Sequence, residues 1–198
     1  MSDRAHEIYD VVGIGFGPSN LSLAIALEEH RAGDPGNGIS ALFLERQRSS
    51  GWHRNMLLPS ATMQISFLKD LATFRNPTSS FSFVAYLHEA GRLPQFVNNQ
   101  DFFPTRQEFH QYLEWAQARV ADRVEYGTEV TSVRLPTGAA PESADRLRLE
   151  VADSTGRTGR VIEARNLGFS SRGGPRKHPR GDTGGRGWDL AALGVPDT

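Results

Sequence analysis

The stretch YDVVGIGFGPSNLSLAIALEEH, residues 9–30, decides the fold class. Its first part, residues 9–14, is a short apolar run with two adjacent valines, as expected for a buried parallel strand. Its last part, residues 21–29, is rich in Leu, Ala and Glu, which favour a helix. Between them lie three glycines at alternate positions and then a proline. The stretch therefore predicts a strand, a tight turn and a helix, the opening unit of an α/β fold.

The turn between strand and helix has the form of an anion-binding loop. Its residues are Gly13, Gly15, Gly17, Pro18, Ser19 and Asn20. The first two glycines permit a tight turn with exposed backbone, and the third permits a ligand to approach where a Cβ would block it. The proline suits a first helical turn, and the two polar side chains and free N–H groups can meet a phosphate. We interpret the turn as a pyrophosphate-binding loop of a dinucleotide fold, with a ligand-free turn as the alternative, because a Gly-x-Gly-x-x-Gly motif would have its third glycine at position 18.

A second strand, ISALFLE at residues 39–45, ends in Glu45. An acid at this place in a dinucleotide fold accepts hydrogen bonds from ribose hydroxyls. The spacing from Gly15 exceeds the usual ~20 residues. The loop HRAGDPGNG at residues 30–38 accounts for the excess. We therefore assign Glu45 to the ribose, with a plain surface glutamate as the alternative.

The composition excludes several classes of function. The 198-residue chain has a net charge of −1 and no cysteine. We therefore expect neither a nucleic-acid nor a membrane partner, no disulfide framework and no cysteine-based site. The six histidines show no zinc spacing, so no metal site is expected. The absence of cysteine and of a signal peptide predicts a cytoplasmic protein.

The remaining segments differ in pattern. Residues 51–93 have no simple period, which is typical of a functional loop or of irregular core packing. Residues 105–120 predict a helix with a capping box at Thr105 and Glu108 and one apolar face. That face comprises Phe109, Tyr112, Leu113, Ala116 and Val120. Residues 123–135, 146–153 and 159–165 predict three strands.

Three of these stretches resemble the flavin-dependent ornithine and lysine N-hydroxylases of siderophore biosynthesis. They are GFGPSNLSLA (15–24), GWHRNMLLPSATMQISFLKDLATFRNPTSSFSFVAYL (51–87) and FFPTRQEFHQYLEWA (102–116). In that family a proline at position 18 is normal. The resemblance implies a Rossmann-like α/β FAD-binding domain of a flavoprotein that has two dinucleotide-binding domains.

The resemblance also implies roles for individual residues. The segment from Glu45 to His53, which includes Trp52, lines the FAD, and Gln64 lies beside its isoalloxazine ring. The ammonium of Lys69 contacts the substrate, for which an α-carboxylate is a suitable charge-assisted partner. A further position, Val130, places its backbone at the adenine end. The alternatives are a solvated surface lysine at position 69 and a core valine at position 130.

The family reaction needs no catalytic side chain. NADPH reduces FAD, O2 forms a C4a-hydroperoxyflavin, and the side-chain amine of L-ornithine or L-lysine attacks it. The middle segment is more similar to the ornithine enzymes, and the family tends to form homo-tetramers. We therefore expect positioning roles for Gln64 and Lys69 and no catalytic residue.

The pattern changes after Leu167. Residues 168–187 contain seven glycines and five Lys or Arg, with one acid and one large apolar residue, Phe169. We therefore divide the chain into a truncated FAD-binding domain, 1–167, and a Gly/Arg-rich tail, 168–198, which is either disordered or translated from a shifted reading frame. A sheet without a closing strand and a mostly missing NADPH site are expected. The alternatives are another FAD-dependent oxidoreductase, such as a reductase or Baeyer–Villiger oxygenase, and an inactive remnant with a weakly RNA-binding tail.

Overall fold

The protein is described from a computed structural model, which covers residues 8–49, 51, 58, 61–136 and 145–170. Its backbone divides into two compact units. Unit 1 contains Met1–Gly15, Ile39–Arg48 and Val124–Thr198, and unit 2 contains Phe16–Gly38 and Ser49–Arg123. In the described part of the chain, every strand belongs to unit 1 and every helix to unit 2.

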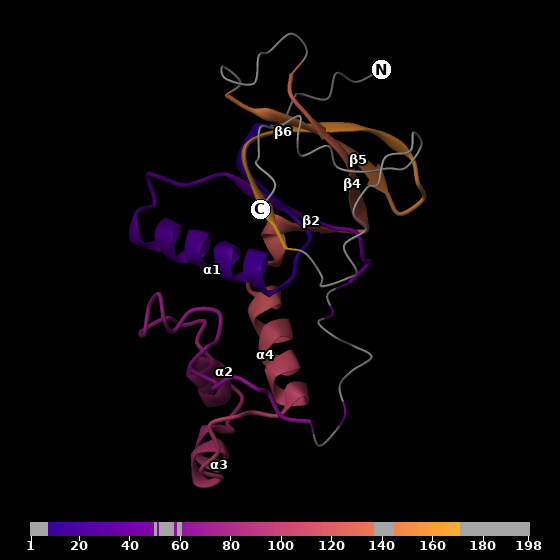
Figure 1. The fold of residues 1–198 in the computed structure, drawn as a ribbon. Helices are drawn as coiled ribbons and strands as arrows, with labels where there is room; N and C mark the ends of the chain where they lie inside the picture. Colours follow the sequence, from indigo (N-terminus) through magenta and orange to yellow (C-terminus); the bar gives the residue numbers. More distant parts are fainter. Residues whose placement is uncertain (1–7, 50, 52–57, 59–60, 137–144, 171–198) are drawn as a thin grey trace, which may run out of the picture. The chain divides into compact units, whose positions relative to one another are not determined.

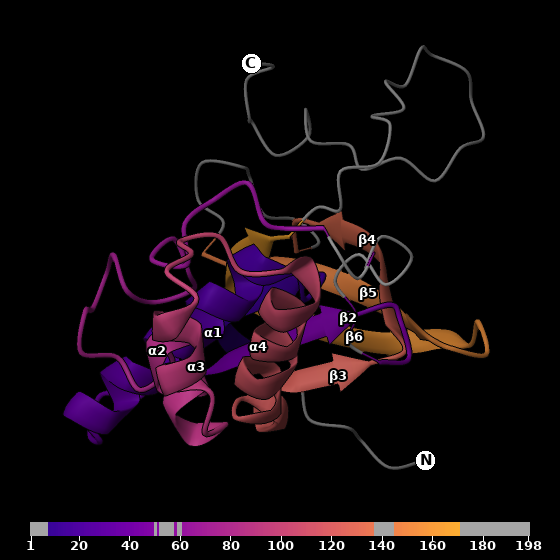
Figure 2. The same ribbon diagram turned by 90° about the horizontal axis from the view of Figure 1, so that it is seen from below.

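Unit 1 is one six-stranded mixed sheet in the order β3-β2-β1-β6-β5-β4 (Figures 1 and 2). Neighbouring strands are parallel from β3 to β6 and antiparallel from β6 to β4. The strands are β1 (Ile8–Ile14), β2 (Ala41–Glu45), β3 (Val124–Tyr126), β4 (Thr128–Arg134), β5 (Leu147–Asp153) and β6 (Thr158–Phe169). The parallel order 3-2-1 followed by a fourth strand is that of a Rossmann-like sheet, as the sequence predicted.

The long strand β6 joins the two parts of this sheet. Residues 158–164 pair with β5, and residues 163–169 pair with β1. The strand runs beyond Leu167, because Gly168 and Phe169 pair with Gly13 and Ile14 of β1. The strand next to β1 therefore includes the predicted strand 159–165 and continues past Leu167, where the sequence analysis expected no strand. Residues 171–198 lie outside the described residues.

The core of unit 1 takes side chains from both parts of the sheet. Buried residues of the parallel strands and of the antiparallel strands form one hydrophobic cluster. Its members are Val12, Leu42, Leu44, Val130, Leu149, Val151, Ile162 and Ala164. Burial of apolar area at about 25 cal/mol per Å² makes such a cluster the main stabilising contact of the unit.

One predicted strand is in fact two. Residues 123–135 break at Gly127, whose φ of 70° lies in the left-handed region. The part before it, β3, pairs with β2 at one end of the sheet, and the part after it, β4, pairs with β5 at the other end. The prediction of a single strand was wrong because a positive φ at a glycine turns the chain without any polar interruption.

The described residues of unit 2 form four α-helices and a short 3-10 helix. The helices are α1 (Pro18–Gly33), α2 (Phe83–Glu89), α3 (Leu93–Asn98), α4 (Arg106–Ala118) and η2 (Ala121–Arg123). Residues 61–82 are irregular, as expected, and α2 is a helix that the sequence analysis did not identify within 51–93. In unit 2, α2 lies beside both α3 and α4 (Figures 1 and 2).

An aromatic cluster forms the core of unit 2. Phe83 at the start of α2 is fully buried, and its ring lies between 5.4 and 6.1 Å from five other aromatic rings. Those rings belong to Phe67, Tyr86, Phe96, Phe109 and Tyr112. All five predicted apolar-face residues of α4 and its C-terminal extension are buried. Aromatic pairs at these separations stabilise a core by about 0.5–1.5 kcal/mol each beyond area burial.

The predicted capping box of α4 is half formed. Thr105 accepts a hydrogen bond from the backbone N–H of Glu108 at 3.1 Å. The Glu108 carboxylate instead pairs with Arg92 at 2.9 Å. The helix start is therefore fixed by the threonine, and the glutamate links α4 to the segment before α3.

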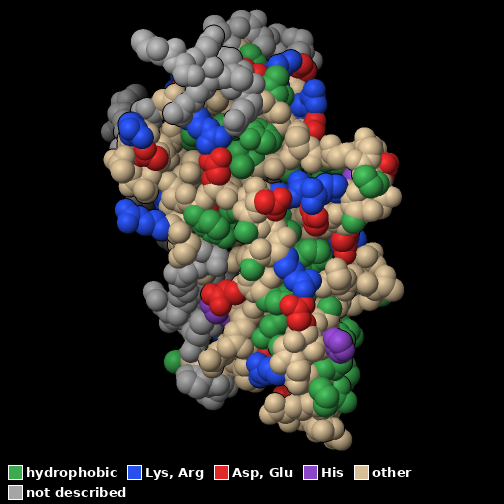
Figure 3. Space-filling view, turned by 180° about the vertical axis from the view of Figure 1, so that it is seen from behind, with side chains coloured by type: hydrophobic (Ala, Val, Ile, Leu, Met, Phe, Trp, Pro, Cys, Tyr) green, Lys and Arg blue, Asp and Glu red, His purple; other side chains and the backbone are tan. Residues whose placement is uncertain are grey.

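Charged side chains of opposite sign lie next to one another on the face shown in Figure 3. The ion pairs of the structure include Arg119–Glu89 and Arg75–Glu29. Among the described residues, no helix is long and apolar enough to cross a membrane.

Candidate functional site

In unit 1, the predicted turn and the predicted ribose acid lie at the carboxyl ends of neighbouring parallel strands. The N–H of Gly15, which follows β1, donates to the carbonyl of Leu44 at 2.9 Å. The next residue of β2, Glu45, pairs with Tyr126 of β3. In open α/β sheets, ligands bind outside the carboxyl ends of the strands. The sheet thus brings Gly15 and Glu45 to the edge where a dinucleotide would bind.

Gly15 is required by the fold of this edge itself. Its φ of +80° is left-handed, and an added Cβ would stand 2.6 Å from the carbonyl oxygen of Ser170. The N–H of Ser170 in turn donates to the carbonyl of Ile14 at 3.0 Å. Gly13, by contrast, lies within strand β1 and is buried there, so it is not a turn residue. The turn proper starts at Gly15.

The carboxylate of Glu45 is held in place by its own backbone. It is half-buried, and Oε1 accepts a hydrogen bond from the N–H of Gln47 at 2.9 Å. The carbonyl of Gln47 accepts from the N–H of Gly127 at 2.9 Å, which ties the end of β2 to the start of β4. An oriented carboxylate at this edge is suited to accept hydrogen bonds from hydroxyl groups.

The position predicted to meet the adenine, Val130, lies on β4 of the same unit. Its side chain is buried in the core cluster, opposite Val151 of β5. The pairing is irregular between Val130 and Ser132, and the preceding residue Glu129 pairs with Arg46 at 3.6 Å. Both interpretations of the sequence therefore stay compatible: the side chain belongs to the core, and the backbone lies near the segment that follows β2.

In unit 2, the start of α1 carries the other residues of the predicted phosphate loop. Gly17 is the N-cap and offers no side-chain hydrogen bond, and Pro18 begins the helix. The first turn contains no acidic residue. Ser19 is exposed, whereas Asn20 is 2% exposed. A helix start without a capping oxygen or an acid leaves its positive end suited to an anion.

The segment with Gln64 and Lys69 is also in unit 2, and both side chains are exposed. Its backbone is held by residues that precede α4. The N–H groups of Met63 and Phe67 donate to the carbonyls of Pro104 at 2.8 Å and Phe102 at 3.0 Å. In the part of the chain that the structure describes, the Lys69 ammonium makes no ion pair, so it is open to an anionic ligand.

Next to Lys69, the Asp70 carboxylate organises the following loop, a role that the sequence analysis missed. Its Oδ1 accepts from the N–H groups of Ala72 at 3.0 Å and Thr73 at 2.7 Å. Its Oδ2 accepts from the hydroxyl of Thr73 and from the N–H of Phe83, both at 2.7 Å. The Asp-x-x-Thr spacing is a turn signal that could have identified the local bonds, but not the bond to Phe83.

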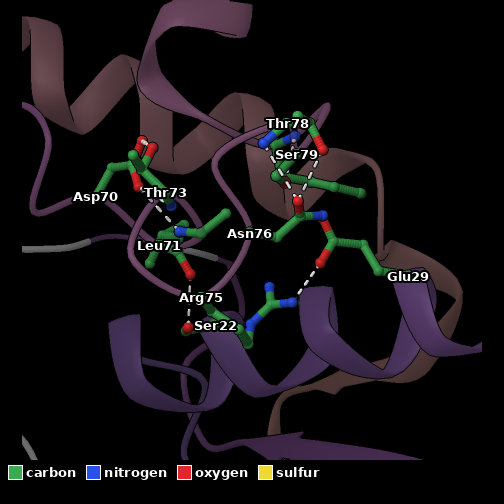
Figure 4. A network of polar contacts seen from close by, with 11 residues as sticks. Ser22, Glu29, Asp70, Leu71, Thr73, Arg75, Asn76, Thr78 and Ser79 are labelled. Carbon is green, nitrogen blue, oxygen red and sulfur yellow. Dashed lines mark hydrogen bonds and ion pairs between the residues drawn. The ribbon is translucent and has the colours of Figure 1, made fainter.

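Helix α1 is attached to the same loop at two points, as Figure 4 shows. The Ser22 hydroxyl donates to the carbonyl of Leu71 at 2.7 Å. Two turns further along, the Glu29 carboxylate pairs with Arg75 and accepts from the side-chain amide of Asn76 at 3.3 Å. The helix that begins at the predicted phosphate loop therefore also fixes the backbone that follows Lys69.

Two predicted cofactor residues, Trp52 and His53, lie outside the described residues. Within the described ranges, no group of three or more His, Cys, Asp or Glu could hold a metal ion.

Comparison with known proteins identifies close relatives. The family model described as L-lysine 6-monooxygenase/L-ornithine 5-monooxygenase matches residues 7–177. The L-ornithine N(5)-monooxygenase of Burkholderia cepacia is 46% identical over 162 residues, which are 81% of this chain and 36% of that protein. The ornithine N-hydroxylase of Kutzneria sp. 744, whose structure is described with reduced FAD, NADP+ and L-ornithine, is 54% identical with a TM-score of 0.72, over 82% of this chain and 37% of that one. The L-lysine 6-monooxygenase of Pseudomonas syringae is 32% identical with a TM-score of 0.69, over 87% and 39%. The chain thus spans little more than a third of the length of these relatives.

Proposed function

Because the chain belongs to the L-lysine 6-monooxygenase/L-ornithine 5-monooxygenase family, we propose that it is the FAD-binding part of an enzyme that hydroxylates the side-chain amine of L-ornithine. The observation that carries the proposal is the 54% identity to an ornithine N-hydroxylase along 82% of this chain. The predictions of a family resemblance and of a Rossmann-like fold of FAD-dependent monooxygenases are confirmed by the same comparisons.

Each unit carries groups whose chemistry suits one part of FAD. We propose that the uncapped start of α1 at Gly17 and Ser19 holds the pyrophosphate, and that Glu45 holds a ribose. The absence of an acid in the first turn supports the first assignment, because a carboxylate there would repel the phosphates. The hydrogen bond from the Gln47 N–H to Glu45 supports the assignment of Glu45 to the ribose. It fixes one carboxylate oxygen and therefore the direction of the other. We further propose that the backbone at Val130 meets the adenine.

The substrate side of the site is proposed around Gln64 and Lys69. When FAD is bound and reduced by NADPH, it supplies the oxygen-activating chemistry of the reaction. The tasks of this chain are to place Gln64 beside the flavin ring and to hold the amino acid through an ion pair between Lys69 and its α-carboxylate. The exposed, unpaired ammonium of Lys69 supports this task. No side chain needs to act as a nucleophile.

L-ornithine is favoured over L-lysine as the substrate. The identity to the ornithine enzymes, 46% and 54%, exceeds the 32% to the lysine enzyme. One methylene discriminates by only about 1–3 kcal/mol in an apolar pocket, so a change of substrate needs few residues. A cytoplasmic location and a homo-tetramer stay predictions.

The test is to express residues 1–198 and to titrate FAD, following the quenching of flavin fluorescence, and then L-ornithine. We expect FAD uptake that Glu45→Gln weakens about threefold to tenfold through the lost charge-assisted hydrogen bond. The matched control is Glu150→Gln, a half-buried glutamate of β5 in the same unit, which should leave FAD affinity unchanged. A chain that takes up no FAD would instead be an inactive remnant, and one that binds FAD but not L-ornithine would contradict the proposed substrate.

The proposal for the tail, residues 168–198, is separate. Its Gly/Arg-rich composition supports a frame change or truncation near Leu167, and most of the NADPH site would then be missing. Sequencing the gene across codons 166–174 tests this. A single base that restores a frame encoding a second dinucleotide fold would support it, whereas a tail peptide identified in cells by mass spectrometry would contradict it.

A further inference from the structure

We propose that Asp70 is a positioning residue for substrate binding: it folds the turn behind Lys69 and ties that turn to the start of α2, so that the lysine ammonium is held ready for the substrate carboxylate. The inference rests on the proposed function of Lys69. Asp70 itself is not proposed to contact the substrate, because its carboxylate oxygens are already hydrogen-bonded to groups of the protein.

Both carboxylate oxygens of Asp70 are fully used as hydrogen-bond acceptors. Its two oxygens accept four hydrogen bonds, three from the next turn of the chain and one from Phe83 at the start of α2. A carboxylate that accepts this many N–H and O–H donors is immobilised, and its charge is compensated by them. Asp70 makes no ion pair with Lys69, whose ammonium makes no ion pair within the described residues.

The loop that follows Lys69 is hydrogen-bonded to three helices. The N–H of Leu71 donates to the hydroxyl of Tyr112 at 3.1 Å, and its carbonyl accepts from Ser22 of α1 at 2.7 Å. The bond from Asp70 to Phe83 adds a third element, α2. Figure 4 shows the anchors at Ser22 and Asp70. An exposed lysine on a free loop would sample many positions. Binding would then restrict its side chain and backbone, and this loss of conformational entropy lowers affinity.

Helix α1 carries both the contacts to this loop and the proposed pyrophosphate site. The helix that holds the loop at Ser22 and Glu29 is the one that starts at Gly17, the proposed pyrophosphate site. A helix is rigid over this length, so the backbone after Lys69 and the phosphate loop share one frame. Ser22 holds the carbonyl of Leu71, and the Asp70 carboxylate fixes the turn in which Leu71 lies.

The test uses the FAD-loaded 198-residue chain and calorimetric titration with L-ornithine. In Asp70→Asn, the amide nitrogen must replace either the oxygen that accepts from the N–H groups of Ala72 and Thr73 or the oxygen that accepts from the N–H of Phe83, so at least one backbone bond is lost. We expect the L-ornithine Kd to rise about tenfold while the FAD Kd stays within about twofold. The matched control is Asp101→Asn, because Asp101 accepts one bond, from Phe103, which an amide oxygen can retain. It should leave both Kd values unchanged.

A double-mutant cycle separates positioning from a general loss of structure. In a Lys69→Met background, Asp70→Asn should have no further effect on L-ornithine, because the contact that it positions is already absent. The diamine 1,4-diaminobutane, which has no carboxylate, should bind Asp70→Asn and the unaltered chain alike. An effect that persists in the Lys69→Met background, or that extends to the diamine, overturns the inference.

The two possible failures are distinguishable. If Lys69→Met does not weaken L-ornithine, or if the unaltered chain binds FAD but no L-ornithine, the proposed use of Lys69 is wrong, and this inference with it. If Lys69→Met weakens binding but Asp70→Asn does not, only the inference is wrong. Should Asp70→Asn fail to fold, Thr73→Val removes the hydroxyl that donates to Asp70 and should raise the L-ornithine Kd about threefold in the same cycle. An unchanged Kd in that variant overturns the inference.

Discussion

The most direct test of the unit 2 core is the change Tyr112→Phe. The ring of Tyr112 is fully buried, and its hydroxyl makes two hydrogen bonds to the backbone of the irregular segment. It donates to the carbonyl of Phe81 at 2.9 Å and accepts from the N–H of Leu71 at 3.1 Å. Phenylalanine keeps the ring contacts and removes both bonds, so the variant isolates the hydroxyl.

The expected loss follows from the two backbone groups left behind. Each buried polar group without a partner costs about 1–3 kcal/mol, so roughly 2–6 kcal/mol of the free energy of unfolding should be lost. With an m-value of about 2 kcal/mol/M, the urea midpoint should fall by about 1–3 M. Circular dichroism at a helix wavelength measures this change in the isolated chain.

The control is Tyr86→Phe, in the same aromatic cluster. Tyr86 is also buried, but its hydroxyl donates one long bond of 3.4 Å to the exposed residue Gln111. Water can replace that partner, so we expect a loss of less than about 1 kcal/mol. Equal midpoints for the two variants would refute the reasoning that Tyr112 holds the irregular segment through its hydroxyl.

Three further changes test other parts of the structure. Gly15→Ala should destabilise unit 1 more than Gly91→Ala destabilises unit 2, because both have a positive φ but only position 15 places a Cβ 2.6 Å from a carbonyl oxygen; equal losses in thermal unfolding would contradict the close approach. Thr105→Ala should cost about 1 kcal/mol in urea unfolding and Thr105→Ser much less, since serine retains the cap on the Glu108 N–H; equal losses would exclude capping as the cause. The pKa of Asp10 is lowered to about 2, first by the Ser40 hydroxyl, then by the Ser40 N–H and Arg165, so its bonds stabilise the folded state above about pH 4 and are lost as the pH falls towards 2. Asp10→Asn should therefore be less stable than the unaltered chain at pH 6 and no less stable near pH 2, and a difference that persists at pH 2 would rule out the carboxylate as its source.

The sequence was sufficient where one local pattern determines one element. Adjacent apolar residues predicted β1 and β2, and the spacing of apolar residues on α4 predicted which side chains are buried. It was insufficient where the choice of partner decides the structure. Residues 123–135 have one continuous strand pattern, yet Gly127 sends the two halves to opposite ends of the sheet. Nothing local distinguishes a strand that pairs with β2 from one that pairs with β5.

The sequence also could not predict hydrogen bonds between residues that lie far apart along the chain. The Asp70 carboxylate bonds to Phe83, thirteen residues away, and the Tyr112 hydroxyl connects Leu71 with Phe81. Both side chains lie in patterns with a simpler explanation, a turn for the aspartate and a helix face for the tyrosine. Their second role exists only once α2 and α4 lie beside each other.

Burial separates the supporting residues from the candidate ligand-binding ones within MQISFLKDL, residues 63–71. Met63 and Leu71 are buried, at 9% and 8% exposed, and packing accounts for them. Hydrogen bonding accounts for Asp70. Neither accounts for Gln64 and Lys69, which are exposed, nor for the exposed apolar side chains of the same segment, Ile65 and Leu68, at 38% and 39%. Gln64 and Lys69 thus lie among exposed apolar side chains on a backbone that hydrogen bonds hold in place, and this mixture of residues is typical of ligand-binding surfaces. The proposed function is therefore tested at Gln64 and Lys69, and the positioning of these residues at Asp70.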